Sequence, residues 1–152
     1  MSGELLNLIK SSKVHKEVMS ELVENNIVKP GESLNNIVNY IESSIKNKVN
    51  YDYNKPLQAG CGFPANISVN EAVAHYTSSP NNKDYIIQEN DIVKVDFGVH
   101  NLGYITDSAQ TFHFNSKYDD FIEISKKATN YAVSLCGTDV NLGDLGKDIE
   151  EY

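Results

Sequence analysis

The sequence contains no arginine: its thirteen positive charges are all lysines, and they stand against twenty-one acidic residues. The net charge is −8, and no basic stripe runs along the chain. Proteins that bind nucleic acids carry a clustered basic surface that attracts the phosphate backbone. The composition therefore argues against a nucleic-acid surface, and we do not expect DNA as a partner.

Cysteine is also scarce, with only Cys61 and Cys136. Two cysteines do not make a disulfide framework, which favours a reducing compartment, and we expect the cytoplasm. No apolar run reaches the roughly 18 residues of a membrane span, and residues 1–4 lack the basic start of a secretory signal. A chain of 152 residues with 40% hydrophobic content is expected to fold as one globular domain.

Apolar residues at helical spacing predict helices over 4–26, from Ser33 onward, over 118–135 and from about Asn141. Ser33 is a favoured helix N-cap, and the apolar residues after it follow the i, i+3, i+4, i+7 pattern. Residues 47–57 are polar and are expected to form a loop. Within 58–79, glycines and Pro64 break any helix, and the segment 68–76 is either a short strand or an irregular wall.

The apolar spacing of the second helix returns in the fourth. The matching positions, at a constant offset, are Leu34, Ile37 and Ile41 in one helix and Leu142, Leu145 and Ile149 in the other. Such a repeat suggests an architecture with two related halves. No strand follows the second helix pair, so we expect only the first half to be complete here.

A predicted hairpin carries two acidic residues, Asp96 and Asp107. Residues 92–100 alternate apolar and polar side chains, as a half-buried strand does, and 103–114 reads as its partner. We expect the turn at Asn101-Leu102 or Asn101-Leu102-Gly103. If residue 100 pairs with residue 103, Asp96 falls opposite Asp107 with Cβ atoms about 5 Å apart. Two like charges directly opposite each other destabilise a hairpin. A divalent metal ion bound between the two carboxylates is the simplest way to offset their repulsion. A one-residue shift would instead put them on opposite faces, as ordinary solvated aspartates.

Three segments together resemble the type 2 methionine aminopeptidases of the creatinase-like, pita-bread family. They are GCGFPANISVNEAVAHYT (60–77), DIVKVDFGVHNLGYITDSAQTF (91–112) and the leading helix pair with KPGESL between its helices. The phrase His75-Tyr76-Thr77 favours type 2 over type 1. The resemblance implies an α+β pita-bread fold, with residues 1–152 forming the N-terminal portion of a single catalytic domain. That portion is the first of two pseudo-symmetric halves: two helices, an antiparallel hairpin sheet and two further helices.

The resemblance also assigns roles to four residues. Asp96 matches an aspartate that chelates one metal ion, and Asp107 matches one that bridges two ions. His75 matches a histidine that contacts substrate and assists the transition state. Phe63 resembles a residue of the pocket for the methionine side chain. The implied cofactor is a pair of divalent ions, Mn, Co, Fe or Zn, which would lower the pKa of a bridging water and polarise the scissile carbonyl.

The activity implied is removal of the N-terminal methionine from peptides and nascent proteins, and the resemblance leaves room for association with the ribosome. In the family, a histidine and two glutamates of the second half complete the five metal ligands. We therefore expect the isolated 152-residue chain to be inactive, to bind metal weakly and to self-associate. No membrane partner is expected.

Two other functions remain open. One is a non-catalytic module that binds protein or RNA, like the proliferation-associated relatives; the presence of Asp96 and Asp107 and the lack of a basic surface argue against it. The other is a different pita-bread enzyme, such as a proline-specific aminopeptidase, which the AHYT phrase disfavours. The histidines without motif support, which we expect to be structural or solvated, are His15, His100 and His113. Asn70 and Glu71 are assigned no chemistry.

Overall fold

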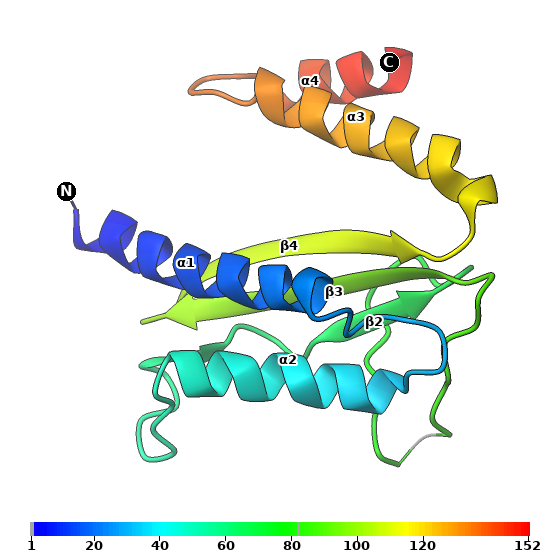
Figure 1. Cartoon of the computed structure of the whole chain (residues 1–152). Helices are drawn as coiled ribbons and strands as arrows, with labels where there is room; N and C mark the ends of the chain where they lie inside the picture. Colours follow the sequence, from blue (N-terminus) through cyan, green and yellow to red (C-terminus); the bar gives the residue numbers. More distant parts are fainter. Residues whose placement is uncertain (1, 82) are drawn as a thin grey trace. The chain divides into compact units, whose positions relative to one another are not determined.

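A computed structural model describes residues 2–81 and 83–152 (Figure 1). The described chain divides into two compact units, one ending at Phe114 and one formed by Asn115–Tyr152. The first unit holds the sheet and two helices. The second holds a short 3-10 turn, Ser116–Tyr118, followed by α3 (Asp119–Leu135) and α4 (Leu142–Glu151), whose Tyr131 and Tyr152 rings stack with centroids 4.8 Å apart.

The sheet is built around one long central strand. Its strands are β1 (Ala59–Cys61), β2 (Asn66–Val69), β3 (Ile92–Asn101) and β4 (Tyr104–His113). Along one edge of β3, β1 pairs near its end and β2 near its start, while β4 pairs along the other edge. All these pairings are antiparallel, so the α+β class predicted from the sequence is confirmed.

Two helices cover one face of this sheet and form the core with it. α1 (Gly3–Glu24) lies against β3 and β4, and α2 (Leu34–Lys48) lies against β1 and β2 (Figure 1). The predicted alternation in β3 is confirmed, because Val93, Val95, Phe97 and Val99 are all fully buried. They pack with the helix residues Val18, Leu22, Ile37, Ile41 and Ile45. The opposite face of β3 carries Lys94, Asp96 and Gly98, and neither α1 nor α2 covers it.

The predicted helix ends are close to the observed ones, and local capping explains where they fall. Ser33 caps α2 as predicted, its Oγ accepting a hydrogen bond from Asn36 N at 3.3 Å. Asn141 caps α4 in the same way. The first helix ends at Glu24 rather than residue 26, because Asn26 takes a left-handed φ of 49°. None of the helices in the described residues is long and apolar enough to cross a bilayer.

The β3–β4 turn differs from the prediction. Asn101 pairs with Tyr104, so the turn is the two residues Leu102-Gly103, with φ values of 51° and 83°. Positive φ at both positions is typical of a type I′ turn, whose twist matches that of the flanking strands. The direct pairing of Asp96 with Asp107 is therefore wrong: the register is shifted by two residues. A shift of two keeps both side chains on one face, where a shift of one would not.

The segment 68–76, for which a short strand and an irregular wall were both open, is mostly irregular. Only its first two residues belong to a strand, β2, which begins earlier than predicted, and the chain then leaves the sheet at Asn70 with a φ of 52°. The Asn70 side chain donates to Asp91 Oδ1 at 2.8 Å and accepts from Ile92 N at 3.0 Å. Asn70 thus fixes the exit of the chain from β2 to the start of β3.

The turn makes a testable prediction, because Leu102 is a non-glycine residue in a left-handed conformation with a side chain 58% exposed. Asparagine tolerates this conformation better, so Leu102→Asn should raise the free energy of unfolding by about 0.5–1 kcal/mol. Urea denaturation measures the change. The matched control, Gly103→Ala, should destabilise the protein, since its φ is also positive. A loss of stability with Leu102→Asn would contradict the turn assignment.

Candidate metal centre

The two aspartates lie together on the sheet face that α1 and α2 leave uncovered. Asp96 pairs across the strands with Ala109, and Asp107 pairs with Gly98, so the two are diagonal neighbours. Their side chains are close enough for the two carboxyl groups to share a hydrogen bond. The expectation that they share one face is confirmed by this arrangement.

The electrostatics of the pair reflect two negative charges without a cation. The pKa of Asp96 is raised, first by its burial and then by its hydrogen bond to Asp107 and the repulsion from that carboxylate. Both effects disfavour the charged form of the Asp96 carboxyl group in the metal-free protein. A divalent ion would remove this penalty, which is the observation that makes the pair fit a metal.

Asn66 and His75 complete the surroundings of Asp96. Asn66, on β2, pairs directly opposite Asp96. The charge of His75 and hydrogen bonding with Asn66 both lower the pKa of Asp96, in part offsetting burial and repulsion. The sequence did not single out Asn66, because the strand that carries it was predicted further along the chain. Its place in the FPAN phrase, within a segment that carries the family resemblance, was the signal that could have identified it.

His75 is exposed and takes a left-handed φ of 65°. The residues after it are held on β2. Tyr76 exchanges two bonds with this strand: its carbonyl accepts from Ile67 N at 2.7 Å, and its N–H donates to Ser68 Oγ at 3.3 Å. Thr77 Oγ1 donates to Asn66 Oδ1 at 2.6 Å. These contacts fix the backbone that presents His75 beside Asp96.

Phe63 forms a wall beside the carboxylates because Gly98 has no side chain. A Cβ on Gly98 would lie 2.5 Å from Cε1 of the Phe63 ring and 3.2 Å from Cγ2 of Ile105. Gly62 N donates to Gly98 O at 2.8 Å, which holds the Phe63 segment against β3. Since Gly98 is the cross-strand partner of Asp107, the ring lies next to the acidic pair. The structure thus gathers Phe63, His75, Asp96 and Asp107 around one sheet face.

The other histidines we can place serve the fold. His15 of α1 is 3% exposed on the opposite, core side of the sheet, where burial lowers its pKa. Its Nε2 lies 3.0 Å from Phe97 O, and its ring stacks on the Phe97 ring with centroids 4.4 Å apart. His100 Nδ1 accepts from Gly103 N at 3.4 Å and so supports the turn. A structural role for His15 and His100 is confirmed.

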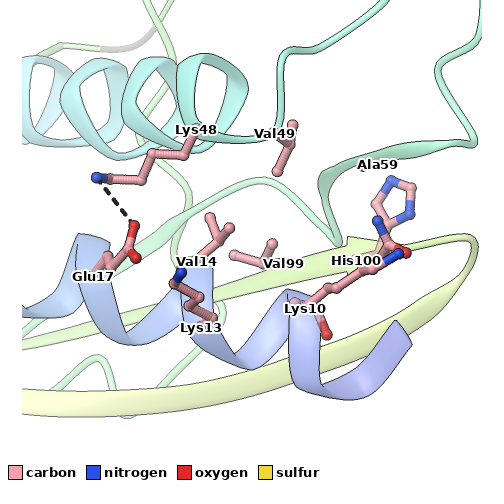
Figure 2. Close-up of a pocket in the computed structure, with 11 residues that line it drawn as sticks. Lys10, Lys13, Val14, Glu17, Lys48, Val49, Ala59, Val99 and His100 are labelled. Carbon is pink, nitrogen blue, oxygen red and sulfur yellow. Dashed lines mark ion pairs between the residues drawn. The ribbon is translucent and has the colours of Figure 1, made fainter. Parts of the chain in front are cut away.

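A hollow on the core side of the sheet is a separate feature. Figure 2 shows it between α1, the end of α2 and the end of β3, with a volume of about 320 Å³. Its charged rim is already neutralised in part, because Lys48 pairs with Glu17 at 3.4 Å and with Glu21 at 2.7 Å. None of the four predicted site residues lines it, so it has no part in the metal centre.

The donor set is suitable for a metal but incomplete. Carboxylate oxygens are ligands that suit Mn²⁺ and related divalent ions. Within the described residues, however, no group of three or more His, Cys, Asp and Glu side chains converges as a metal cage. Asp96 and Asp107 therefore fit as part of a ligand set rather than as a whole one.

Comparisons with known proteins show the family of this chain. The sequence pattern of metallopeptidase family M24 matches residues 7–152. Methionine aminopeptidase 2-2 of Chaetomium globosum is 40% identical over 155 residues, covering 99% of this chain and 35% of that protein. Methionine aminopeptidase 2 of Aspergillus oryzae is 38% identical over 145 residues, covering 93% of this chain and 31% of that protein. The chain spans about a third of the length of the curated relatives it matches.

Solved structures share the fold. An X-Pro aminopeptidase from Thermotoga maritima has a TM-score of 0.77 at 17% identity, covering 98% of this chain and 40% of that one. A methionine aminopeptidase from streptococci has a TM-score of 0.76 at 19% identity, covering 98% of this chain and 64% of that one. At these identities the likeness concerns the fold alone, and the predicted pita-bread architecture is confirmed.

The charge pair predicts an unusual stability change. A folded-state pKa above the unfolded value means that stability present at low pH is lost as the pH rises through the folded pKa of Asp96. Asp107→Asn removes the repulsion and should make the metal-free protein more stable at neutral pH, with a gain that shrinks as the pH falls through the folded pKa of Asp96 and is lost below the ordinary aspartate pKa. Urea unfolding with a chelator present measures it. Asp148→Asn, which removes an exposed carboxylate of the other compact unit, is the charge control and should not reproduce the gain.

The close approach at Gly98 predicts a second change. Gly98→Ala places a methyl group against the Phe63 ring and should destabilise the protein by about 1–3 kcal/mol, as overpacking does. The same substitution in a Phe63→Ala background should cost much less, because the obstructing ring is gone. Urea unfolding of the four variants measures the coupling. Equal costs in both backgrounds would show that the ring does not lie on Gly98.

Proposed function

The chain belongs to metallopeptidase family M24, and from that premise we propose that it contributes to the active site of a type 2 methionine aminopeptidase. The observation that carries the proposal is the facing pair Asp96 and Asp107, held on the open sheet face with His75 beside it. Membership of a metallopeptidase family implies dependence on a divalent metal. The substrate class we propose is peptides and nascent chains that begin with methionine, in the cytoplasm.

In this proposal Asp96 would be a ligand of one of two divalent ions, and Asp107 would be a ligand of both. The pair, of Mn, Co, Fe or Zn, would supply an activated water at neutral pH and polarise the scissile carbonyl. The carboxylates provide the negative charge that two closely spaced cations require. Their position on the rigid β3–β4 hairpin keeps the spacing fixed, because ten consecutive residues of each strand are paired.

In the same proposal, the side chains of His75 and Phe63 orient the substrate. His75 stands beside Asp96 and, as a hydrogen-bond donor next to the scissile carbonyl, would stabilise negative charge that develops on its oxygen. The Phe63 ring offers an apolar wall for the methionine side chain, with Ile105 close to the same glycine. The remaining ligands, a histidine and two glutamates by resemblance, would come from the second half of the fold.

Activity assays test the proposal directly. The intact mass of the polypeptide in its own cells defines the form to purify, and a peptide such as Met-Ala-Ser is the substrate. We expect methionine release that requires added Mn or Co and is lost in Asp107→Asn, since a neutral amide cannot bridge two cations. Residues 1–152 expressed alone should release no methionine and should self-associate at high concentration. Robust turnover by a monomer of that length would refute the need for further ligands.

The role of His75 has its own test. His75→Ala should lower kcat by about 100-fold while metal content, measured by mass spectrometry, stays near that of the wild type. His100→Ala is the matched control, because that ring supports the turn, and it should leave kcat largely unchanged. If metal content falls in His75→Ala as steeply as in Asp107→Asn, His75 is a ligand and the proposed role is wrong.

A further inference from the structure

We propose that Asn66 is a positioning residue that couples the metal-binding strand to the segment carrying His75, with Thr77 as the second member of the link. The inference rests on the proposed function for its catalytic meaning, since it concerns how His75 is placed over the metal-binding pair. Its geometry stands independently, because it depends on the sheet register and on one short hydrogen bond.

The first half of the link is the sheet register. Asn66 is the residue of β2 directly opposite Asp96 on β3, so the two side chains leave the same face about 5 Å apart at Cβ. The Asn66 side chain also lies close enough to the Asp96 carboxylate to lower its pKa. A movement of the Asn66 side chain would therefore change the surroundings of Asp96, which is a proposed metal ligand.

The second half of the link reaches His75. Thr77 Oγ1 donates to Asn66 Oδ1 at 2.6 Å, and Thr77 follows His75 by only two residues. Tyr76, between them, is bonded to β2 through both its N–H and its carbonyl. The backbone from His75 to Thr77 therefore has little freedom, and the place where Thr77 is anchored sets where the imidazole stands.

The chemistry of the amide explains why asparagine suits this position. Its carbonyl accepts from the Thr77 hydroxyl, and its NH₂ group is a donor that can face the Asp96 carboxylate opposite it, so one side chain can serve both partners. Aspartate has the same shape but no donor, and it would add a third negative charge beside the pair. Groups that orient metal ligands in this way typically change affinity or activity by about 10–100-fold when replaced.

Thr77 gives the cleaner variant, because it touches the link without touching Asp96. Thr77→Val keeps the shape and removes the hydroxyl, and we expect kcat to fall about tenfold with metal affinity, measured by calorimetry, within about threefold of the wild type. Thr77→Ser restores the donor and should recover most of the rate. Asn66→Asp should weaken metal binding as well as lower kcat.

A double-mutant cycle decides whether Thr77 acts through His75. If it does, Thr77→Val should cost nothing further in a His75→Ala background, because the ring it positions is gone. Additive losses in kcat would overturn the inference. Equal rates for the wild type and Thr77→Val would overturn it as well, whatever the protein's stability.

A measurement without catalysis separates this inference from the proposed function. In the metal-free protein, Thr77→Val should shift the His75 ring resonances in NMR spectra and speed hydrogen exchange of the Tyr76 amide, and Thr77→Ser should do neither. If the intact polypeptide shows these changes but releases no methionine with added Mn or Co, the link is supported and the aminopeptidase is refuted. Unchanged His75 resonances in an active enzyme would refute the link alone.

Discussion

Repulsion between Asp96 and Asp107 is the constraint around which this structure is arranged. The two carboxylates sit on one sheet face at hydrogen-bonding range, and they remain there only because the strands beneath them cannot slide. A slip of one residue would separate the pair, but it would also turn Val95 and Phe97 out of the core. The burial of apolar side chains therefore holds together two charges that would otherwise move apart.

The sheet divides these duties between its faces. On one side α1 and α2 bury the apolar residues of β3, and His15 anchors α1 to the carbonyl of Phe97, the residue directly after Asp96. On the other side the backbone of Gly62 approaches Gly98 closely enough to bring an aromatic ring beside the acids. The sheet face packed against the helices thus supports the face that carries Asp96 and Asp107, because only one layer of backbone separates them.

The parts that were predictable from sequence depend on local chemistry. The alternation through Val93, Val95 and Phe97 identified the buried face, and Ser33 marked the start of α2 by its capping hydroxyl. The turn was misplaced because Leu102 is an unusual residue for a positive φ, so nothing local distinguished Leu102-Gly103 from its neighbours. The predicted strand register was wrong by two residues, so Asp96 lies opposite Ala109 rather than opposite Asp107.

Long-range contacts could not be predicted from the sequence for a different reason. β2 has only four residues, too few for a periodic signal, and so its pairing with Asp96 through Asn66 was not foreseen. The nearness of His75 to Asp96 could be expected only from the resemblance to a family. No spacing rule links two residues so far apart in the chain when the segment between them is irregular.

The backbone at His75 has a consequence for how this protein can change over generations. A left-handed φ costs a histidine on the order of 1–3 kcal/mol that a glycine there would not incur. Selection for folding alone would therefore favour glycine at position 75. A library randomised at this position and passed through a screen for stability alone should become enriched in glycine.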